Sequence, residues 1–148
     1  ALPAGAPPVD FSDVTDVADP EYLKLREDIQ SLRIYFDSGQ PNPTAGQDGA
    51  LDQLAANMKS IMAVAHRLGF SVRLAIVGHA DQTGKLANNL GLSIARSEVV
   101  RSLLRSRGIA PELMSVRGTG TLEPVAEGAA PQDMSSNRSV SFTITTSE

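Results

Sequence analysis

The 148-residue sequence has no cysteine, no tryptophan, and only two tyrosines and four phenylalanines. Without cysteine the chain has no disulfide, no thiolate zinc site, no thiol nucleophile and no lipid-bearing N-terminal cysteine. It also lacks an excess of positive charge, because 13 Lys and Arg stand against 17 Asp and Glu and the net charge is −4. A nucleic-acid surface needs basic side chains and usually stacking rings, so we expect no nucleic-acid partner.

Long hydrophobic runs are absent too. None approaches the roughly 18 residues of a membrane helix, because even the most apolar strand candidates are interrupted by Arg73, Gly78 or His79. We therefore expect this segment to be soluble, with the membrane anchor of its parent protein outside it. What is present fits one globular domain, since 41% of the residues are hydrophobic and 20% are charged.

Three parts are expected along the chain. Residues 1–18 open with Ala, Pro and Gly without periodicity, which is typical of a linker or disordered end. Residues 19–31 are expected to form a short helical extension, because Asp19 suits a helix cap, Pro20 suits the first helical position, and apolar residues then recur at helical spacing. Residues 32–148 are expected to form the folded domain.

Apolar residues within this domain switch between the period of a strand and that of a helix. The elements should run in the order strand, helix, strand, helix, strand, strand, and the Ser and Thr side of the last strand indicates a sheet covered on one face. We therefore expect an α+β fold, a two-layer βαβαββ sandwich with a mixed sheet and its helices on one face. The predicted strands are 32–36, 71–78, 114–116 and 139–145, and the predicted helices are 48–68, ending at Gly69, and 86–107, ending at Gly108.

Arg96 stands out on the second of these long helices. At about 100° per residue it falls among apolar side chains such as Leu92, Val100 and Leu103. The residues three and four positions away include no carboxylate. An unpaired buried charge costs several kcal/mol, so either the fold or a ligand must supply an anion. Arg138 repeats the feature, because it shares the parity of the apolar face of the last strand.

Asp81 is the leading protein carboxylate for Arg96, since it lies in the loop before the helix that carries this arginine. Loops at strand ends commonly hold ligands. An acid and a guanidinium in one cleft suit a ligand with both an ammonium and a carboxylate, because arginine can hold a carboxylate by two parallel hydrogen bonds. Three alternatives stay open: a turn or cap role for Asp81, a buried salt bridge without a ligand, and solvent exposure of Arg138 at a frayed strand end.

Four motifs follow one another between Ile34 and Thr145: Gly78-His79-Ala80-Asp81, the pattern NxxLSxxR from Asn89 to Arg96, Gly118-Thr119-Gly120, and Asn137-Arg138-Ser139-Val140. In this order and spacing they resemble the OmpA-like peptidoglycan-binding domain. The resemblance implies a non-catalytic module, without cofactor or metal, that binds the diaminopimelate of the wall's stem peptide and anchors an envelope protein. It also implies a location in the periplasm or cell envelope of a Gram-negative-type bacterium and leaves a homodimer open.

The same resemblance implies roles for individual residues. Asp81 would hold the ammonium group and Arg96 the carboxylate. Ala80 and Ser139 stand where the family usually has threonine and arginine, which bears on affinity and not on the fold; the parity of Ser139 assigns it to the wet face of the sheet. The other residues expected to bind the ligand or hold the cleft together are Phe36, Asp37, Ser38, Thr83, Asn89 and Arg138.

Two other functions stay open. His79 and Asp81 are two residues apart and suggest an enzyme, but a zinc hydrolase needs about three ligands and a glycosidase needs a second, facing carboxylate. The only other histidine is His66, on a different helix, so we expect His79 to make a structural hydrogen bond. The second alternative is an OmpA-like interaction or dimerisation module that has lost wall binding, which the departures at Ala80 and Ser139 favour.

Overall fold

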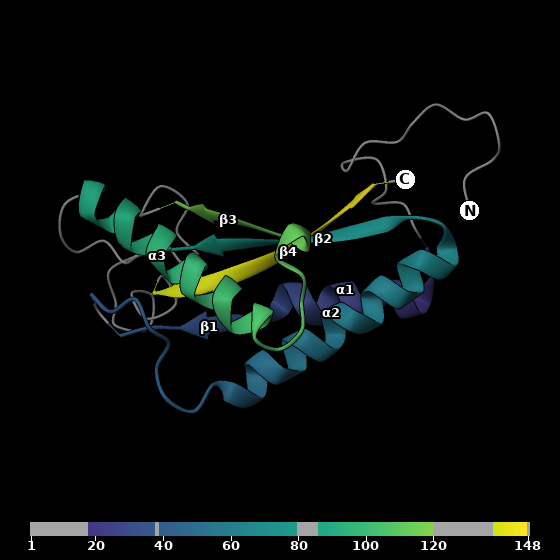
Figure 1. Cartoon of the computed structure of the whole chain (residues 1–148), viewed down its shortest axis with the longest axis horizontal. Coiled ribbons are helices and arrows are strands. Elements are labelled where there is room, and N and C mark those ends of the chain that lie inside the picture. The colour runs from purple at the N-terminus through teal and green to yellow at the C-terminus, as the bar shows by residue number, and fades with distance from the viewer. Residues whose placement is uncertain (1–17, 38, 80–85, 120–137, 148) are drawn as a thin grey trace.

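A computed structural model describes residues 18–37, 39–79, 86–119 and 138–147 of the chain (Figure 1). These residues form three α-helices and a four-stranded sheet. From β1 onward the order is strand, helix, strand, helix, strand, strand, as predicted. The elements are α1 (Pro20–Ser31), β1 (Arg33–Tyr35), α2 (Asp48–Leu68), β2 (Ser71–Gly78), α3 (Leu86–Arg105), a 3-10 turn (Pro111–Leu113), β3 (Met114–Gly118) and β4 (Ser139–Ser147).

The sheet is mixed and has the strand order β1-β4-β2-β3. β2 and β3 are parallel, whereas β4 is antiparallel to both of its neighbours, β1 and β2. Along β2, Val72, Leu74 and Ile76 are buried, while Ser71 and Arg73, which alternate with them, are exposed. This alternation leaves one face of the sheet for the helices, so the predicted α+β sandwich with helices on one face is confirmed.

The helices divide the covered face between them (Figure 1). α3 lies over β3 and β2, while α1 and α2 lie side by side, with α1 next to β4. Leu54, Met58 and Ile61 on α2 are completely buried and share one core with Phe142 of the sheet. Within the described residues, none of the helices combines the length and apolarity needed to cross a membrane.

α1 contributes to this same core. Its Tyr22 and Ile29 are buried, and the side chain of Asp19 caps its first turn by accepting a hydrogen bond from the Tyr22 amide at 3.0 Å. Burial raises the pKa of the Tyr22 hydroxyl. β1 is short. Before its first residue, the Gln30 side chain of α1 accepts a hydrogen bond from the Ile144 amide of β4 at 2.9 Å. The boundary predicted between an extension and a domain at residue 32 stays a prediction.

Glycines mark the ends of the helical segments, and strand pairing sets the end of β3. Gly69 and Gly108 have φ of 90° and 94°, the left-handed conformation that suits the end of a helix. α3 ends at Arg105, two residues before the predicted end, because the amides of Arg107 and Gly108 bond three residues back in a tight turn. β3 extends beyond its predicted end at residue 116, since it stays paired with β2 up to Gly118.

Candidate ligand-binding site

Arg96 is the largest of the completely buried side chains, with 1% of its surface exposed. Its guanidinium donates to three backbone carbonyls, from Nε to Gln40 at 2.9 Å, from Nη1 to His79 at 3.0 Å and from Nη2 to Asp37 at 3.0 Å. The central carbon also lies 5.1 Å from the centroid of the Phe36 ring. The inward orientation expected from the helical wheel is therefore present, and the guanidinium is held in one position.

The segment after β1 supplies two of these three acceptors and is itself fixed by Gln47. The Gln47 side chain accepts a hydrogen bond from the Tyr35 amide at 2.8 Å and donates to the Tyr35 carbonyl at 2.7 Å. It therefore pairs with Tyr35 much as a neighbouring strand would. The same amide nitrogen donates to the Thr44 hydroxyl at 2.8 Å. These bonds close the loop, so the carbonyls of Asp37 and Gln40 are already arranged for Arg96.

His79 supplies the third acceptor from the end of β2. Its backbone amide donates to the Ser139 carbonyl at 2.8 Å. Its ring is hydrogen-bonded on both sides, with Nε2 at 2.9 Å from the Ser141 hydroxyl and Nδ1 at 3.3 Å from the Thr119 hydroxyl. The expected structural hydrogen bond of His79 is thus present, and these contacts hold the residue whose carbonyl receives Arg96.

Arg138, the residue directly before β4, contacts the same segment. It is half-buried, its Nε donates to the Phe36 carbonyl at 3.2 Å, and its own carbonyl accepts the Phe36 amide at 2.9 Å. Asn89 is buried on α3, seven residues before Arg96 and therefore on the same side of the helix. The structure thus brings Arg96 and Arg138 together around Phe36 and the Asp37 carbonyl. The predicted site residues Ser38, Asp81 and Thr83 lie outside the described residues.

Two guanidinium groups, those of Arg96 and Arg138, meet the chain directly after β1, where they donate to backbone carbonyls. A guanidinium has five N–H donors in a planar fork that matches a carboxylate. Burial strengthens its attraction for an anion, because the surroundings screen charge less than water does. A carboxylate is the type of acceptor that such a donor set matches in geometry and charge.

The expectation that Ser139 lies on the wet face of the sheet is wrong, because its side chain is completely buried. It is the first residue of β4, where it pairs with Tyr35 of β1 on one side and accepts the His79 amide on the other. Parity along the strand predicted the exposed side of the sheet, but residues at the end of β2 enclose this position. An arginine there would have to place its charge in a buried setting.

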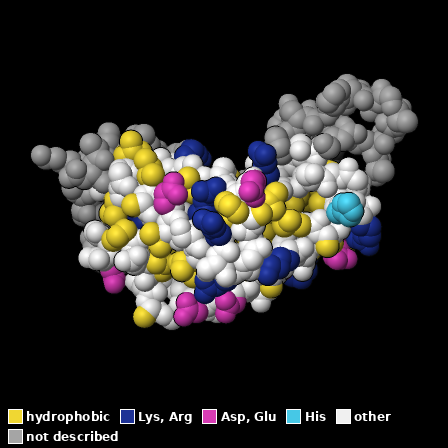
Figure 2. All heavy atoms as spheres, viewed as in Figure 1, with side chains coloured by type: hydrophobic (Ala, Val, Ile, Leu, Met, Phe, Trp, Pro, Cys, Tyr) yellow, Lys and Arg dark blue, Asp and Glu magenta, His cyan; other side chains and the backbone are white. Residues whose placement is uncertain are grey.

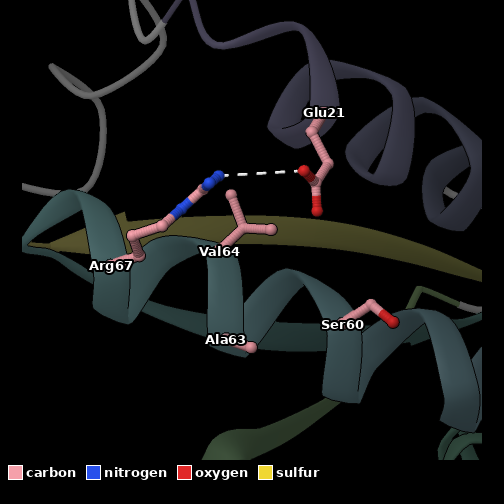
Figure 3. Close-up of a pocket in the computed structure, with 5 residues that line it drawn as sticks. All are labelled: Glu21, Ser60, Ala63, Val64 and Arg67. Atoms are coloured by element: carbon pink, nitrogen blue, oxygen red, sulfur yellow. Dashed lines mark ion pairs between the residues drawn. The ribbon is translucent and has the colours of Figure 1, made fainter.

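A separate hollow of about 330 Å³ lies between α1 and α2 (Figure 3). It is lined by Glu21, Ser60, Ala63, Val64 and Arg67, and Arg67 reaches toward Glu21 across it with an Nη2 to Oε2 distance of 3.8 Å. Both charged side chains are mostly exposed to water, so this ion pair is weak. None of the predicted site residues lines this hollow. Within the parts of the chain that the structure describes, no three His, Asp or Glu side chains gather as a metal site requires.

Comparison with known proteins gives the family. Residues 35–138 match the model of the OmpA family, and the chain belongs to this family. Over 101 residues it is 32% identical to the peptidoglycan-binding protein ArfA of Mycobacterium tuberculosis, a match that covers 67% of this chain and 31% of ArfA. It is 30% identical to the peptidoglycan-associated lipoprotein of Pseudomonas aeruginosa over 76% of this chain and 60% of the lipoprotein. The chain thus spans less than two thirds of either relative.

Solved structures share the fold. The peptidoglycan-associated lipoprotein of Burkholderia pseudomallei superposes with a TM-score of 0.65 at 25% identity, covering 88% of this chain and 98% of that one. The periplasmic domain of MotB from Helicobacter pylori gives a TM-score of 0.61 at 16% identity, covering 77% of this chain and 69% of that one. At this lower identity the second likeness speaks for the fold alone.

Sequence reasoning missed several residues that build the site. Gln40 and His79 contribute backbone carbonyls, which every residue type carries, so no residue-type signal marks them. Gln47 acts through a side-chain amide twelve residues from its partner Tyr35, and no periodicity connects the two. Among the described residues that follow β1, Phe36 and Asp37 were anticipated, through the family resemblance.

Proposed function

We propose that this chain is a non-catalytic module that binds peptidoglycan through the diaminopimelate of the stem peptide and anchors an envelope protein to the wall. Membership of the OmpA family supports the wall as the ligand, as do relatives named for peptidoglycan binding or association. The observation that carries the proposal is the buried guanidinium of Arg96, which three carbonyls hold in one position.

Diaminopimelate suits this site because its side chain ends in an amino acid, with an ammonium and a carboxylate on one carbon. Arg96 would bind the carboxylate by charge-assisted hydrogen bonds, and Asp81 would bind the ammonium. A site whose charged groups are already oriented loses little entropy when the ligand enters. The residues proposed to line the site or hold it together are Phe36, Asp37, Ser38, Thr83, Asn89 and Arg138.

Wall binding also determines where in the cell the module works. Binding to the wall places this module in the periplasm or cell envelope, in a Gram-negative-type bacterium. It also implies a parent protein that is attached to a membrane, so that the module connects that membrane to the wall. The work of such a module is retention by the wall, and the proposal assigns it no cofactor and no metal.

The first test is a titration of the whole chain with a stem peptide that contains meso-diaminopimelate and, in parallel, with the same peptide containing L-lysine, whose side chain ends in an ammonium without a carboxylate. We expect saturable binding of the diaminopimelate peptide and much weaker binding of the lysine peptide by calorimetry. Arg96→Lys should lower the affinity about 100-fold, because a bidentate contact between charged groups is lost, at roughly 3 kcal/mol. Isolated diaminopimelate-type sacculi should retain the chain better than lysine-type sacculi.

Arg105→Lys is the matched control, because Arg105 lies on the same helix and is exposed. This variant should bind as the unchanged chain does, and circular dichroism should show that both variants are folded. Equal retention by the two wall types, or unchanged affinity in folded Arg96→Lys, contradicts the proposal. Release of soluble fragments from the sacculi, with or without added zinc, contradicts its non-catalytic part.

A competing function is self-association without wall binding. It is favoured by two large apolar side chains on the outer side of α3, Leu90 and Ile94, which are 38% and 41% exposed. Sedimentation velocity of the whole chain distinguishes the two functions. A dimer that is unaffected by diaminopimelate, together with no retention by sacculi, supports the competing function and contradicts ours.

A further inference from the structure

Two glycines, Gly78 and Gly118, face each other at the ends of the parallel strands β2 and β3. Both lie beneath α3 where Ser93 and Ile94 pass over the sheet. A Cβ atom at Gly78 would lie 1.8 Å from the Ser93 carbonyl oxygen, and one at Gly118 would lie 2.5 Å from the Ile94 amide nitrogen. Backbone therefore contacts backbone at these two points, and no other residue type fits without moving the helix.

Space, and not backbone conformation, requires these glycines. Gly69 and Gly108 have positive φ, which favours glycine for a different reason, whereas Gly78 and Gly118 do not. At the other end of α3, Val100 and Leu104 are completely buried and fill the interval between the helix and its neighbours. The two glycines thus allow the end of α3 that carries Ser93 to approach the sheet more closely than side chains would permit.

This close approach reaches Arg96 directly. Arg96 follows Ser93 by one turn of α3, and its Nη1 donates to the carbonyl of His79, the residue after Gly78. The distance between α3 and the end of β2 therefore sets the length of that hydrogen bond. We propose that Gly78 and Gly118 are positioning residues for the ligand-binding guanidinium of Arg96. This inference rests on the proposed function.

A displacement of α3 has a predictable size. Ordinary contacts of a Cβ atom begin at 3.4 Å, so a methyl group at Gly118 displaces the helix by about 1 Å, and one at Gly78 by more. The bonds from Arg96 to Gln40, His79 and Asp37 are 2.9 to 3.0 Å long. A shift of about 1 Å stretches them beyond hydrogen-bonding distance unless the side chain reorients. Either response moves the guanidinium away from the carboxylate of the ligand.

The test compares Gly118→Ala with Gly91→Ala in the whole chain, by titration with the stem peptide that contains meso-diaminopimelate. Gly91 lies on α3 itself, and a Cβ atom there would meet nothing within 4 Å. We expect Gly118→Ala to lower the affinity at least about 10-fold and Gly91→Ala to leave it within about 2-fold. Leu104→Ala serves as a second control, since it destabilises the far end of α3 without touching the glycines.

A spectroscopic readout separates positioning from general stability. The Nε–H of Arg96, which donates to the Gln40 carbonyl, gives a proton–nitrogen correlation that is identified by its loss in Arg96→Lys. In Gly118→Ala this signal should shift and exchange faster with water. In Gly91→Ala and Leu104→Ala it should stay in place. If Gly118→Ala does not fold, the double variant Gly118→Ala with Ile94→Ala takes its place in every measurement. The second substitution removes the Ile94 side-chain atom that the new methyl group would meet.

The outcomes distinguish this inference from the function on which it rests. Unchanged affinity in folded Arg96→Lys overturns the proposed function. The inference alone is overturned by a different result. In that case Arg96→Lys loses affinity, while Gly118→Ala or its double variant keeps wild-type affinity and an unmoved Arg96 signal. Loss of affinity in both, with the moved signal, supports both.

Discussion

The two halves of α3 bury opposite kinds of side chain. In the second half Val100 and Leu104 are buried while Ser102 and Arg105 are exposed, the usual pattern of an amphipathic helix. From Asn89 to Ser97, which we call the first half, four polar residues are buried and two large apolar residues are exposed. Figure 2 shows hydrophobic side chains on the surface where Figure 1 places the start of α3. The buried polar residues are Asn89, Ser93, Arg96 and Ser97, and the exposed apolar residues are Leu90 and Ile94.

Hydrogen bonding explains how the inverted half is tolerated. A buried polar group is costly unless it finds a partner. The Ser93 and Ser97 hydroxyls donate to the carbonyls of Leu90 and Ile94 within the helix, at 2.8 and 2.7 Å, and Arg96 donates to three carbonyls. The hydrophobic effect therefore holds the second half of α3 in place, whereas hydrogen bonds satisfy the buried polar residues of the first half. We infer that this half serves binding more than stability.

The largest expected effect comes from removing the centre of the inverted half. Arg96→Ala removes the donor from three backbone carbonyls, at roughly 1 kcal/mol each, so the free energy of unfolding should fall by about 3 kcal/mol. Binding of diaminopimelate should be lost as well. Urea denaturation measures the first and calorimetry the second. A stability loss below about 1 kcal/mol indicates that the carbonyls find water, and that Arg96 contributes little to the fold.

An ordinary core residue in the second half gives the complementary result. Leu104→Ala should lower the free energy of unfolding by about 2 kcal/mol, the lower end of the range for buried leucines, because Leu104 lies in the last turn of α3. Affinity for diaminopimelate should stay within about 2-fold when measured well below the unfolding transition. A large loss of affinity in the folded variant means that the halves are coupled, and breaks the comparison.

The smallest effect is expected on the outer side of the inverted half. Leu90→Gln should change the free energy of unfolding by less than about 0.5 kcal/mol, because this side chain is already 38% exposed. Denaturation in urea again provides the measurement, with Leu104→Ala as the reference for a buried leucine. A cost above 1 kcal/mol shows that Leu90 is covered in solution, and self-association is then the first cause to examine by sedimentation.

Much of the fold was predictable because it depends on local periodicity and local end signals. α2 begins and ends where its apolar spacing and Gly69 predict. Ile34 and Phe36 are buried as their alternation indicates, and Arg96 is inward as the wheel places it. Each of these features depends on residues within a few positions of one another, where hydrophobic pattern and backbone preference are strong signals.

The site was less predictable because its contacts join distant segments. Arg96 donates to backbone carbonyls 56, 17 and 59 residues away, which no local pattern marks, and the anion expected for it stays a prediction. Ser139 was misplaced because parity ignores what encloses the end of a strand. The inversion in the first half of α3 was only partly seen, since the wheel marked Arg96 as unusual but did not mark Ser93 and Ser97, which are buried as well.

The order of residues by itself determined the elements, the one-sided sheet and a charged side chain turned inward, because helix and strand periods are written in neighbouring positions. Only the tertiary structure decided which atoms receive that charge and how closely α3 approaches the sheet. The physical reason is that backbone carbonyls and missing Cβ atoms have no residue-type signature. Their effect depends on which segments the fold brings to within a few ångströms of each other.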